Sequence, residues 1–392
     1  MFARRLQQVR LARNLSLDAL AAKMGGMVTK QALSKYERGQ SNPSPVVLAK
    51  LAESLGVRAA YFLADPGIRI EFIAYRSSPR LLAKEAKQLE SRIQHELESR
   101  VEVLNLLGKS DGSRVPVGAY SVHDHKDAEA AAENLRSRWQ LGIAPIVNVT
   151  DTLENNSTCV FDIETGVNFD GISAKVFDDQ DNLKTIALVT RANVDGVRQR
   201  LNLAHELGHV VMIVDEDLDE ELAAFRFGAA FLMPASMIFQ EVGEKREIIQ
   251  LDELLFLKRR FGLSVQSLLH RLLELGIIKE SYYYDWRSLL NKMGWKMHEP
   301  EDWPFERSGW MKRQVLRLLV EGVIGVDQAE RLLGQKIDDW MPESLVQRKE
   351  FLKLPIEKRR KILAEQALAL AQHYSTFSEE EGPIGGGDII DY

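Results

Sequence analysis

Apolar residues recur at helical spacing in the middle of the chain, in the segment Val197–Val211 (VRQRLNLAHELGHVV). The apolar stripe consists of Leu201, Ala204, Leu207, Gly208 and Val211. This spacing predicts a mostly buried helix. Upstream, Lys184–Thr190 (KTIALVT) is an apolar and β-branched run between turn-forming residues, which predicts a strand. A strand beside this helix could hold a peptide by adding it to the edge of a sheet.

Further segments follow the same two periodicities. Two more strands are expected at Pro145–Thr150 and Thr158–Ile163, and the other periodic segments predict helices. The expected helices are Leu81–Leu107, Ala128–Gln140, Leu222–Pro234, Leu251–Phe261, Val265–Leu275, Trp286–Met293, Met311–Glu321, Asp327–Leu333 and Ile356–His373. The pattern therefore predicts an α+β, mostly helical fold in which a small mixed sheet packs against helices.

The first 66 residues, which we call the head, show only short helical patterns. The expected helices are Phe2–Arg13, Leu17–Met24, a third helix capped by Thr29 and running through Arg38, Val46–Leu55 and Ala59–Ala64. Ser16 is the expected N-cap of the second helix, and Gly25-Gly26 makes the turn before the third. Several short helices with a glycine turn between the second and third predict an all-α helix-turn-helix domain.

The distribution of charge changes the interpretation of the head. The whole chain has a formal net charge of −6, yet residues 1–64 contain ten Lys or Arg and three acidic residues, a charge of +7. The remaining residues carry −13. A basic segment on an acidic body indicates a nucleic-acid-binding module at one end of the chain. A protein-binding helical module of the same shape is the alternative.

Composition limits where the protein acts. Apolar runs are too short for a membrane-spanning helix, and the basic N-terminal helix lacks the apolar core of a secretory signal. The single cysteine, Cys159, excludes an internal disulfide framework and fits a reducing compartment. We therefore expect a cytoplasmic protein that does not associate with membranes, with Cys159 packed in the core.

The predicted central helix contains the motif H-E-x-x-H at residues 205–209. His205 and His209 are four residues apart, so they lie one turn apart on the same helix face and both imidazoles can reach one metal ion. Glu206 follows the first histidine and can accept a proton from a metal-activated water. The motif predicts metal-dependent hydrolysis with Glu206 as the catalytic base.

A catalytic zinc ion requires a third protein ligand and keeps one position open. Glu220 and Glu221 fall in the first turn of the next predicted helix, and either could reach the metal. The preceding segment Asp215–Asp219 is expected to be a solvated acidic loop, and His123–His125 are expected to be surface residues of a polar loop. Zinc is the expected cofactor, although manganese or iron would accept the same ligands.

Two segments, RLNLAHELGHVV at 200–211 and ELAAFRFGAAFLMP at 221–234, resemble the signature segments of the ImmA/IrrE family of metallopeptidases. The resemblance covers roughly residues 68–300 and implies a zincin-like domain with zinc endopeptidase activity. The family places its third ligand three residues before an alanine, with a phenylalanine three further on and an LMP ending. That spacing selects Glu221. Phe225 and Gly228 replace a polar residue and an alanine of the family, away from the ligand positions.

The head resembles the Cro/C1-type (Xre) family in the segments LDALAAKMG, VTKQALSKYERG and SPVVLAKLAESLGV. The resemblance implies that the third helix enters the major groove of a double-stranded DNA operator, and that a homodimer reads two half-sites. Gln31 could bond adenine bidentately, whereas Glu37 and Arg38 are expected to tie the helix end to its neighbours. The expected DNA contacts are Thr29, Lys30, Gln31, Ser34 and Lys35.

These features divide the chain into five parts. They are a helix-turn-helix domain at 1–66, a helical linker region at 67–127, a metallopeptidase domain at 128–300, a helical region at 301–377 and a flexible acidic tail at 378–392. Trp295, Trp303 and Trp310 lie between helices and are expected to be packing anchors.

Two functions fit this organisation. In the first, a DNA-bound zinc endopeptidase cleaves a repressor or antitoxin-like regulator, either co-encoded or itself, in a stress, phage or toxin-antitoxin context. In the second, the protein is a DNA-binding repressor or antitoxin whose metal domain senses or binds a partner without cleaving it. The intact set His205, Glu206, His209 and Glu221 favours the first function.

Overall fold

The computed structural model describes residues 1–63, 67–77, 83–108, 114–164, 169–295, 298–337, 351 and 354–377. The expected tail at 378–392 and the end of the expected helix at Ala64 lie outside these residues. The chain forms two compact units, Met1–Leu318 and Leu319–Tyr392. The second unit contains α15 (Val326–Leu333) and α17 (Ile356–Phe377), and α14 (Trp310–Val320) crosses the boundary.

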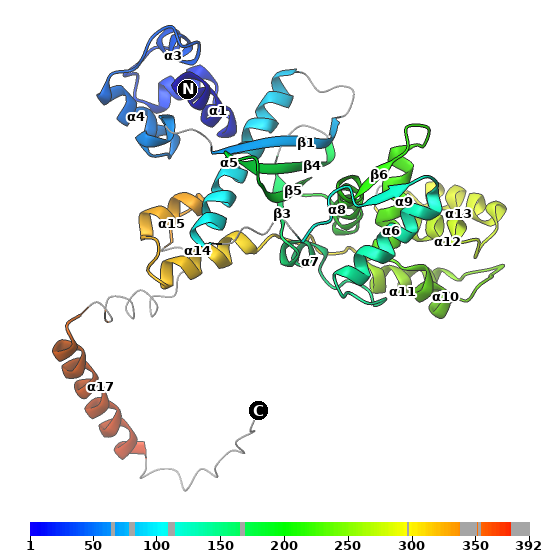
Figure 1. Cartoon of the computed structure of the whole chain (residues 1–392). Coiled ribbons are helices and arrows are strands. Elements are labelled where there is room, and N and C mark those ends of the chain that lie inside the picture. Colours follow the sequence, from blue (N-terminus) through cyan, green and yellow to red (C-terminus); the bar gives the residue numbers. More distant parts are fainter. Residues whose placement is uncertain are drawn as a thin grey trace. The chain divides into compact units, whose positions relative to one another are not determined.

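The head folds as a group of short helices, as expected (Figure 1). They are α1 (Phe2–Ala12), α2 (Leu17–Lys23), α3 (Lys30–Glu37), α4 (Pro45–Leu55) and a 3-10 turn, η1 (Ala59–Phe62), where an α-helix was expected. Ser16, Thr29 and Ser44 each accept a hydrogen bond from a backbone N–H in the first turn, which fixes where α2, α3 and α4 begin. The helices enclose a small core that includes Leu20 and Leu33.

The body contains a mixed four-stranded sheet with the strand order β1-β4-β5-β3. The strands are β1 (Ile68–Ser77), β3 (Thr158–Ile163), β4 (Phe169–Asp178) and β5 (Leu183–Arg191). β3 and β5 are parallel, and the other two pairs are antiparallel. Ile186 and Leu188 of β5 pack on the face that carries the H-E-x-x-H helix, whereas Ala187 and Val189 pack on the opposite face. Helices therefore cover both faces of the sheet.

The segment expected to be a helical linker, 67–127, contributes to this sheet. Its first part is strand β1, which pairs with β4, a strand that was not predicted. Its long helix, α5 (Ala83–Leu106), packs Leu89, Ile93 and Leu97 against the sheet. The segment therefore supplies one strand and one covering layer of the body.

Cys159 of β3 lies in the cluster between α5 and the sheet, so its expected packing role is confirmed. Burial raises the pKa of the Cys159 thiol to about 11. A thiol with this pKa stays protonated near neutral pH, which fits a structural residue.

Two expectations about strands were wrong. Pro145–Thr150 is not a strand: the carbonyls of Ile146 and Val147 accept hydrogen bonds from Arg200, and Asn148 caps α7 (Val149–Asn155). β5 is not an edge to which a peptide could be added, because β4 and β3 occupy both of its sides. The outer strands of this sheet are β1 and β3.

The remaining helices of the first unit surround the H-E-x-x-H helix. They are α6 (His125–Arg138), α8 (Gly196–Val211), α9 (Glu220–Leu232), α10 (Ala235–Val242), α11 (Leu251–Phe261), α12 (Val265–Glu274) and α13 (Glu280–Lys292). Two short strands, β2 (Tyr120–Val122) and β6 (Met212–Val214), pair in parallel. α10 and both short strands were not predicted. These helices form the largest apolar cluster, in which α8 lies against α9.

Among the described residues, no single helix is long and apolar enough to cross a membrane. α9 and α10 meet this test of length and apolar composition only as a pair, and the pair is bent by 58° between the two helices.

Candidate metal centre

The H-E-x-x-H helix, α8, is almost completely buried along the motif. His205, Glu206 and His209 are between 1% and 6% exposed. Glycines allow α9 to approach closely: a Cβ on Gly228 would lie 3.0 Å from the backbone nitrogen of His205, and a Cβ on Gly208 would lie 3.0 Å from the Phe227 ring. Gly228, which departs from the family pattern, thus sits where the two helices leave little room for a side chain.

Three side chains from α8 and α9 bring their donor atoms together. Nε2 of His205 lies 3.1 Å from Nε2 of His209 and 3.4 Å from Oε2 of Glu221, and Nε2 of His209 lies 3.7 Å from Oε1 of Glu221. Tetrahedral zinc with ligands at about 2.0–2.2 Å requires donors about 3.3–3.6 Å apart. The three side chains therefore fit one metal ion, and two neutral imidazoles with one carboxylate form a donor set typical of zinc.

Glu220 occupies a different place from Glu221, although the two are adjacent. Oε1 of Glu220 lies 3.0 Å from Nδ1 of His209, on the side of the imidazole that faces away from the converging Nε2 atoms. A carboxylate at Nδ1 fixes the orientation and tautomer of a metal-binding histidine. The geometry therefore favours Glu221 as the third ligand and Glu220 as the residue that orients His209.

Gly171 of β4 makes room for the carboxylate of Glu206. A Cβ at Gly171 would lie 2.5 Å from Oε1 of Glu206 and 2.6 Å from its Cγ. Any other residue at this position would displace the expected base. Sequence reasoning missed Gly171, although a glycine within a strand often marks the close approach of another group.

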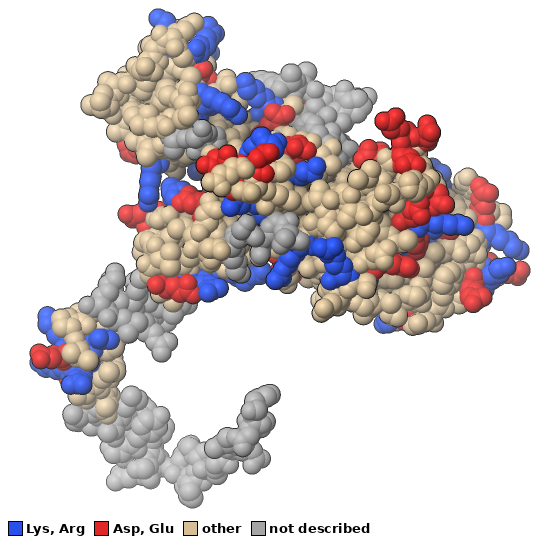
Figure 2. Space-filling view, viewed as in Figure 1, with Lys and Arg blue, Asp and Glu red and all other residues tan. Residues whose placement is uncertain are grey.

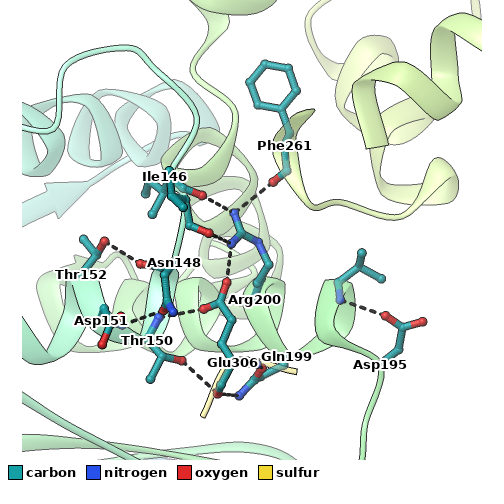
Figure 3. A network of polar contacts seen from close by, with 12 residues as sticks. Ile146, Asn148, Thr150, Asp151, Thr152, Asp195, Gln199, Arg200, Phe261 and Glu306 are labelled. Carbon is teal, nitrogen blue, oxygen red and sulfur yellow. Dashed lines mark hydrogen bonds and ion pairs between the residues drawn. The ribbon is translucent and has the colours of Figure 1, made fainter. Parts of the chain in front are cut away.

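A buried arginine anchors the first half of α8 (Figure 3). The guanidinium of Arg200 donates hydrogen bonds to the carbonyls of Ile146, at 2.7 Å, and Phe261, at 3.1 Å, and forms an ion pair with Glu306. Burial lowers the pKa of Arg200, and the negative charge of Glu306 opposes this change. The arginine therefore joins three distant segments to the helix that carries the metal donors.

Gln199, the residue before Arg200 in α8, binds the backbone of Glu306 through its side chain. Its Nε2 donates to the carbonyl of Glu306, and its Oε1 accepts from the Glu306 N–H, each at 2.8 Å. The Glu306 carboxylate also accepts from the Thr150 N–H at 2.8 Å. The segment around Glu306 thus belongs to the same compact unit as the metal donors.

The predicted packing role of the three tryptophans is confirmed. Trp295 packs against the largest apolar cluster, Trp303 lies 5.0 Å from the guanidinium carbon of Arg200, and Trp310 is 9% exposed beneath Arg100.

A cleft of about 1020 Å³ is lined by residues of α8 and α9 that neighbour the donors, although no donor residue lines it. Its apolar lining includes Leu201, Leu222, Phe225, Trp295 and Trp303. The Phe225 ring also packs against the imidazole of His205, with 4.2 Å between ring centroids. Because Leu222 follows Glu221 directly and Phe225 contacts His205, a chain held in this cleft would lie next to the donor atoms.

The acidic segment before α9 is solvated, as expected. Asp215, Glu216, Asp217 and Asp219 are exposed, and acidic side chains gather over the connection between β6 and α9 in Figure 2. His123 and His125 are exposed as well, and Asp124 caps α6, so that helix begins three residues before the expected Ala128. A hydrogen bond with Asp215 raises the pKa of His123. The prediction of surface residues is confirmed.

The expected DNA contacts comprise the N-cap residue of α3 and four residues of the helix itself. Thr29, Lys30, Gln31 and Lys35 are exposed, and Ser34 is half-buried. Lys30 also forms an exposed ion pair with Asp18, at 2.6 Å. Lys and Arg side chains are visible on the face of the head shown in Figure 2.

The end of α3 is tied to α1 through one of the two residues expected to do so. Glu37 accepts two hydrogen bonds from Arg10, at 2.6 and 2.8 Å, and this pair is largely buried. Arg38 is exposed instead and serves as the C-cap residue. Leu33 is fully buried in the head.

Comparison with known families agrees with this geometry. A helix-turn-helix family model matches residues 6–62, and the model of the IrrE N-terminal-like domain, a peptidase family, matches residues 169–273. No curated protein and no solved structure matches the chain. The matches support a DNA-binding regulator that carries a metallopeptidase-type domain. More specifically, the chain joins a Cro/C1-type helix-turn-helix domain to a domain of the ImmA/IrrE type, which confirms both resemblances.

Proposed function

We propose that the protein is a DNA-binding regulator whose zinc-dependent endopeptidase domain cleaves another regulatory protein. One observation carries this proposal: the donors of His205, His209 and Glu221 converge within 3.1–3.7 Å beside the buried Glu206. The adjacent cleft is large enough and apolar enough to hold a peptide segment. A carboxylate next to a three-donor metal site is the arrangement that metal-dependent peptide hydrolysis requires.

A zinc ion held by these residues would lower the pKa of a water molecule and polarise the scissile carbonyl. Glu206 takes the proton from the attacking water and passes it to the leaving amine. Gly171 leaves the space in which the Glu206 carboxylate lies, and Glu220 holds the His209 imidazole in orientation. The apolar wall formed by Leu222 and Phe225 positions the peptide.

The head supplies the location of the activity. The exposed side of α3, with Lys30, Gln31 and Lys35, enters the major groove of an operator, and a homodimer binds two half-sites. The substrate is a repressor or antitoxin-like regulator that acts at the same operator in the cytoplasm, or the protein itself. Attachment to the operator keeps the peptidase domain near that substrate.

The test compares the parent protein with Glu206→Gln and with the control Glu216→Gln, which changes an exposed residue of the acidic loop. Metal content and cleavage of the regulator encoded beside this gene are measured for all three. We expect one zinc per chain in each protein and cleavage by the parent and the control only. Equal cleavage by Glu206→Gln, or a zinc-loaded parent that cleaves nothing, would contradict the proposal.

A further inference from the structure

The cleft near the metal donors is lined by Arg191, at the end of β5. A second cavity, of about 200 Å³, lies at the start of the same strand. It shares no lining residue with the cleft. Its walls come from α5, α7, β5 and α14, and four of its side chains are cationic. They are Arg100, Arg114, Lys184 and Arg313, against a single acidic residue, Glu154.

Arg100 of α5 is a buried cation with few partners. It is 5% exposed, and its guanidinium carbon lies 3.2 Å from the centroid of the Trp310 ring. Its polar contacts among the described residues are long: NH2 lies 3.5 Å from the Thr158 carbonyl, NH1 lies 3.5 Å from Oε1 of Glu154, and Nε has no acceptor. A guanidinium has five N–H donors, and buried donors in folded proteins are almost always satisfied.

Glu154 is the acidic partner of this group, but it lies at a long distance. Its Oε1 lies 3.5 Å from NH1 of Arg100, beyond the length of a good charge-assisted hydrogen bond. Its oxygens accept shorter bonds from neutral donors, the Ser308 hydroxyl at 2.7 Å and the Trp310 N–H at 3.1 Å. The carboxylate also lies 3.6 Å from NH2 of Arg313, so one negative charge is shared between two cations of the lining and the start of α14.

Two of the other cations have acidic neighbours outside the cavity lining. Lys184 lies 3.1 Å from Asp178 in a mostly buried pair, and Arg313 lies 3.4 Å from Asp151 in a pair whose side chains are about half exposed. The exposed Arg313 pair is weak and exchanges readily for a stronger anion. The cavity lining has four cationic side chains and one acidic side chain, Glu154, so its formal charge is +3.

We propose that this cavity binds a small phosphate-type oxyanion, either inorganic phosphate or a small phosphorylated metabolite. Arginine forks and a lysine recognise phosphate oxygens through several short charge-assisted bonds. A space of about 200 Å³ corresponds to roughly six or seven water molecules, which excludes a nucleic acid chain. The site is separate from the metal centre and does not depend on peptidase activity.

The test measures the affinity of the full chain for inorganic phosphate, glycerol 3-phosphate and succinate at constant ionic strength, by calorimetry and by the shift in melting temperature. The cavity variant is the double substitution Arg114→Ala/Arg313→Ala. The control is Arg259→Ala, because Arg259 is similarly exposed and pairs with Glu301 outside the cavity. Both variants are checked for an unchanged melting temperature without ligand.

We expect phosphate or glycerol 3-phosphate to bind the parent and the control alike, and at least about tenfold more weakly to the cavity variant. Tighter binding of glycerol 3-phosphate would identify a phosphorylated metabolite, and tighter binding of phosphate the free ion. The head and a bound metal can also attract phosphate. The difference in phosphate affinity between the cavity variant and the control therefore measures the binding that depends on the cavity. Equal affinity in both variants, no binding by the parent, or preference for succinate would overturn the proposal.

Discussion

Replacing Glu306 by glutamine tests the claim that a buried ion pair holds the metal-binding helix. Glu306 forms the ion pair with Arg200, whose side chain is fully buried, and also accepts from the Thr150 N–H. Glutamine has nearly the same shape but no charge, and its amide can serve only one of these two donors with its oxygen. Arg200 would keep its backbone acceptors, Ile146 and Phe261, without a counter-charge.

The size of the effect follows from burial. Removing one partner of a buried ion pair costs about 3–5 kcal/mol, because the remaining charge is desolvated and uncompensated. Since glutamine retains one acceptor, we expect the lower end of that range, about 3 kcal/mol. Each 1.4 kcal/mol is a factor of ten in an equilibrium constant, so the opening of α8 should become about a hundredfold more frequent.

Hydrogen exchange of the α8 amides measures this opening directly. The control is Glu301→Gln in the same segment, because Glu301 pairs with Arg259 at 2.9 Å on the exposed surface. An exposed pair contributes at most about 1 kcal/mol. If the α8 amides of Glu306→Gln exchange within about threefold of those of the control, the buried pair does not anchor the helix and the reasoning is refuted.

Two further predictions concern single residues. Gly171→Ala should abolish cleavage but not zinc binding, since its Cβ displaces the Glu206 carboxylate rather than a donor; unchanged turnover would show that this carboxylate is not the base. Burial opposes the low pKa of Glu129, but the hydrogen bond and charge of Arg271 and the charge of Arg226 outweigh it. Glu129 therefore stabilises the fold fully above its unfolded pKa, near 4.5, and less as pH falls through its lower folded value. The difference in urea midpoint between the parent and Glu129→Gln should be large at pH 7 and shrink as the pH falls below 4.5; a constant difference would contradict this assignment.

Local signals explain what the sequence predicted correctly. Ser16 and Thr29 cap helices through their own side chains, and the apolar stripe of α8 depends only on helical spacing. The fold of the head and the position of His205 and His209 on one helix face could therefore be predicted.

The failures came from contacts between distant segments. The apolar run at Pro145–Thr150 has the composition of a strand, yet two of its carbonyls accept hydrogen bonds from Arg200, some 50 residues away. β1 pairs with β4 across about 100 residues, and no local pattern encodes that pairing. The choice between Glu220 and Glu221 depends on the rotation of α9 about its axis, which only packing against α8 determines.

The metal content of two neighbouring variants, Glu221→Ala and Glu220→Ala, tests the central claim most directly. Both substitutions remove one carboxylate from the same turn of α9, so their effects on the helix are matched. The geometry predicts one zinc per chain in the parent, near-complete loss in Glu221→Ala, and retention in Glu220→Ala with an affinity about 10–100-fold lower. Full zinc binding by Glu221→Ala, or a greater loss in Glu220→Ala, would contradict the assignment of His205, His209 and Glu221 as the metal site.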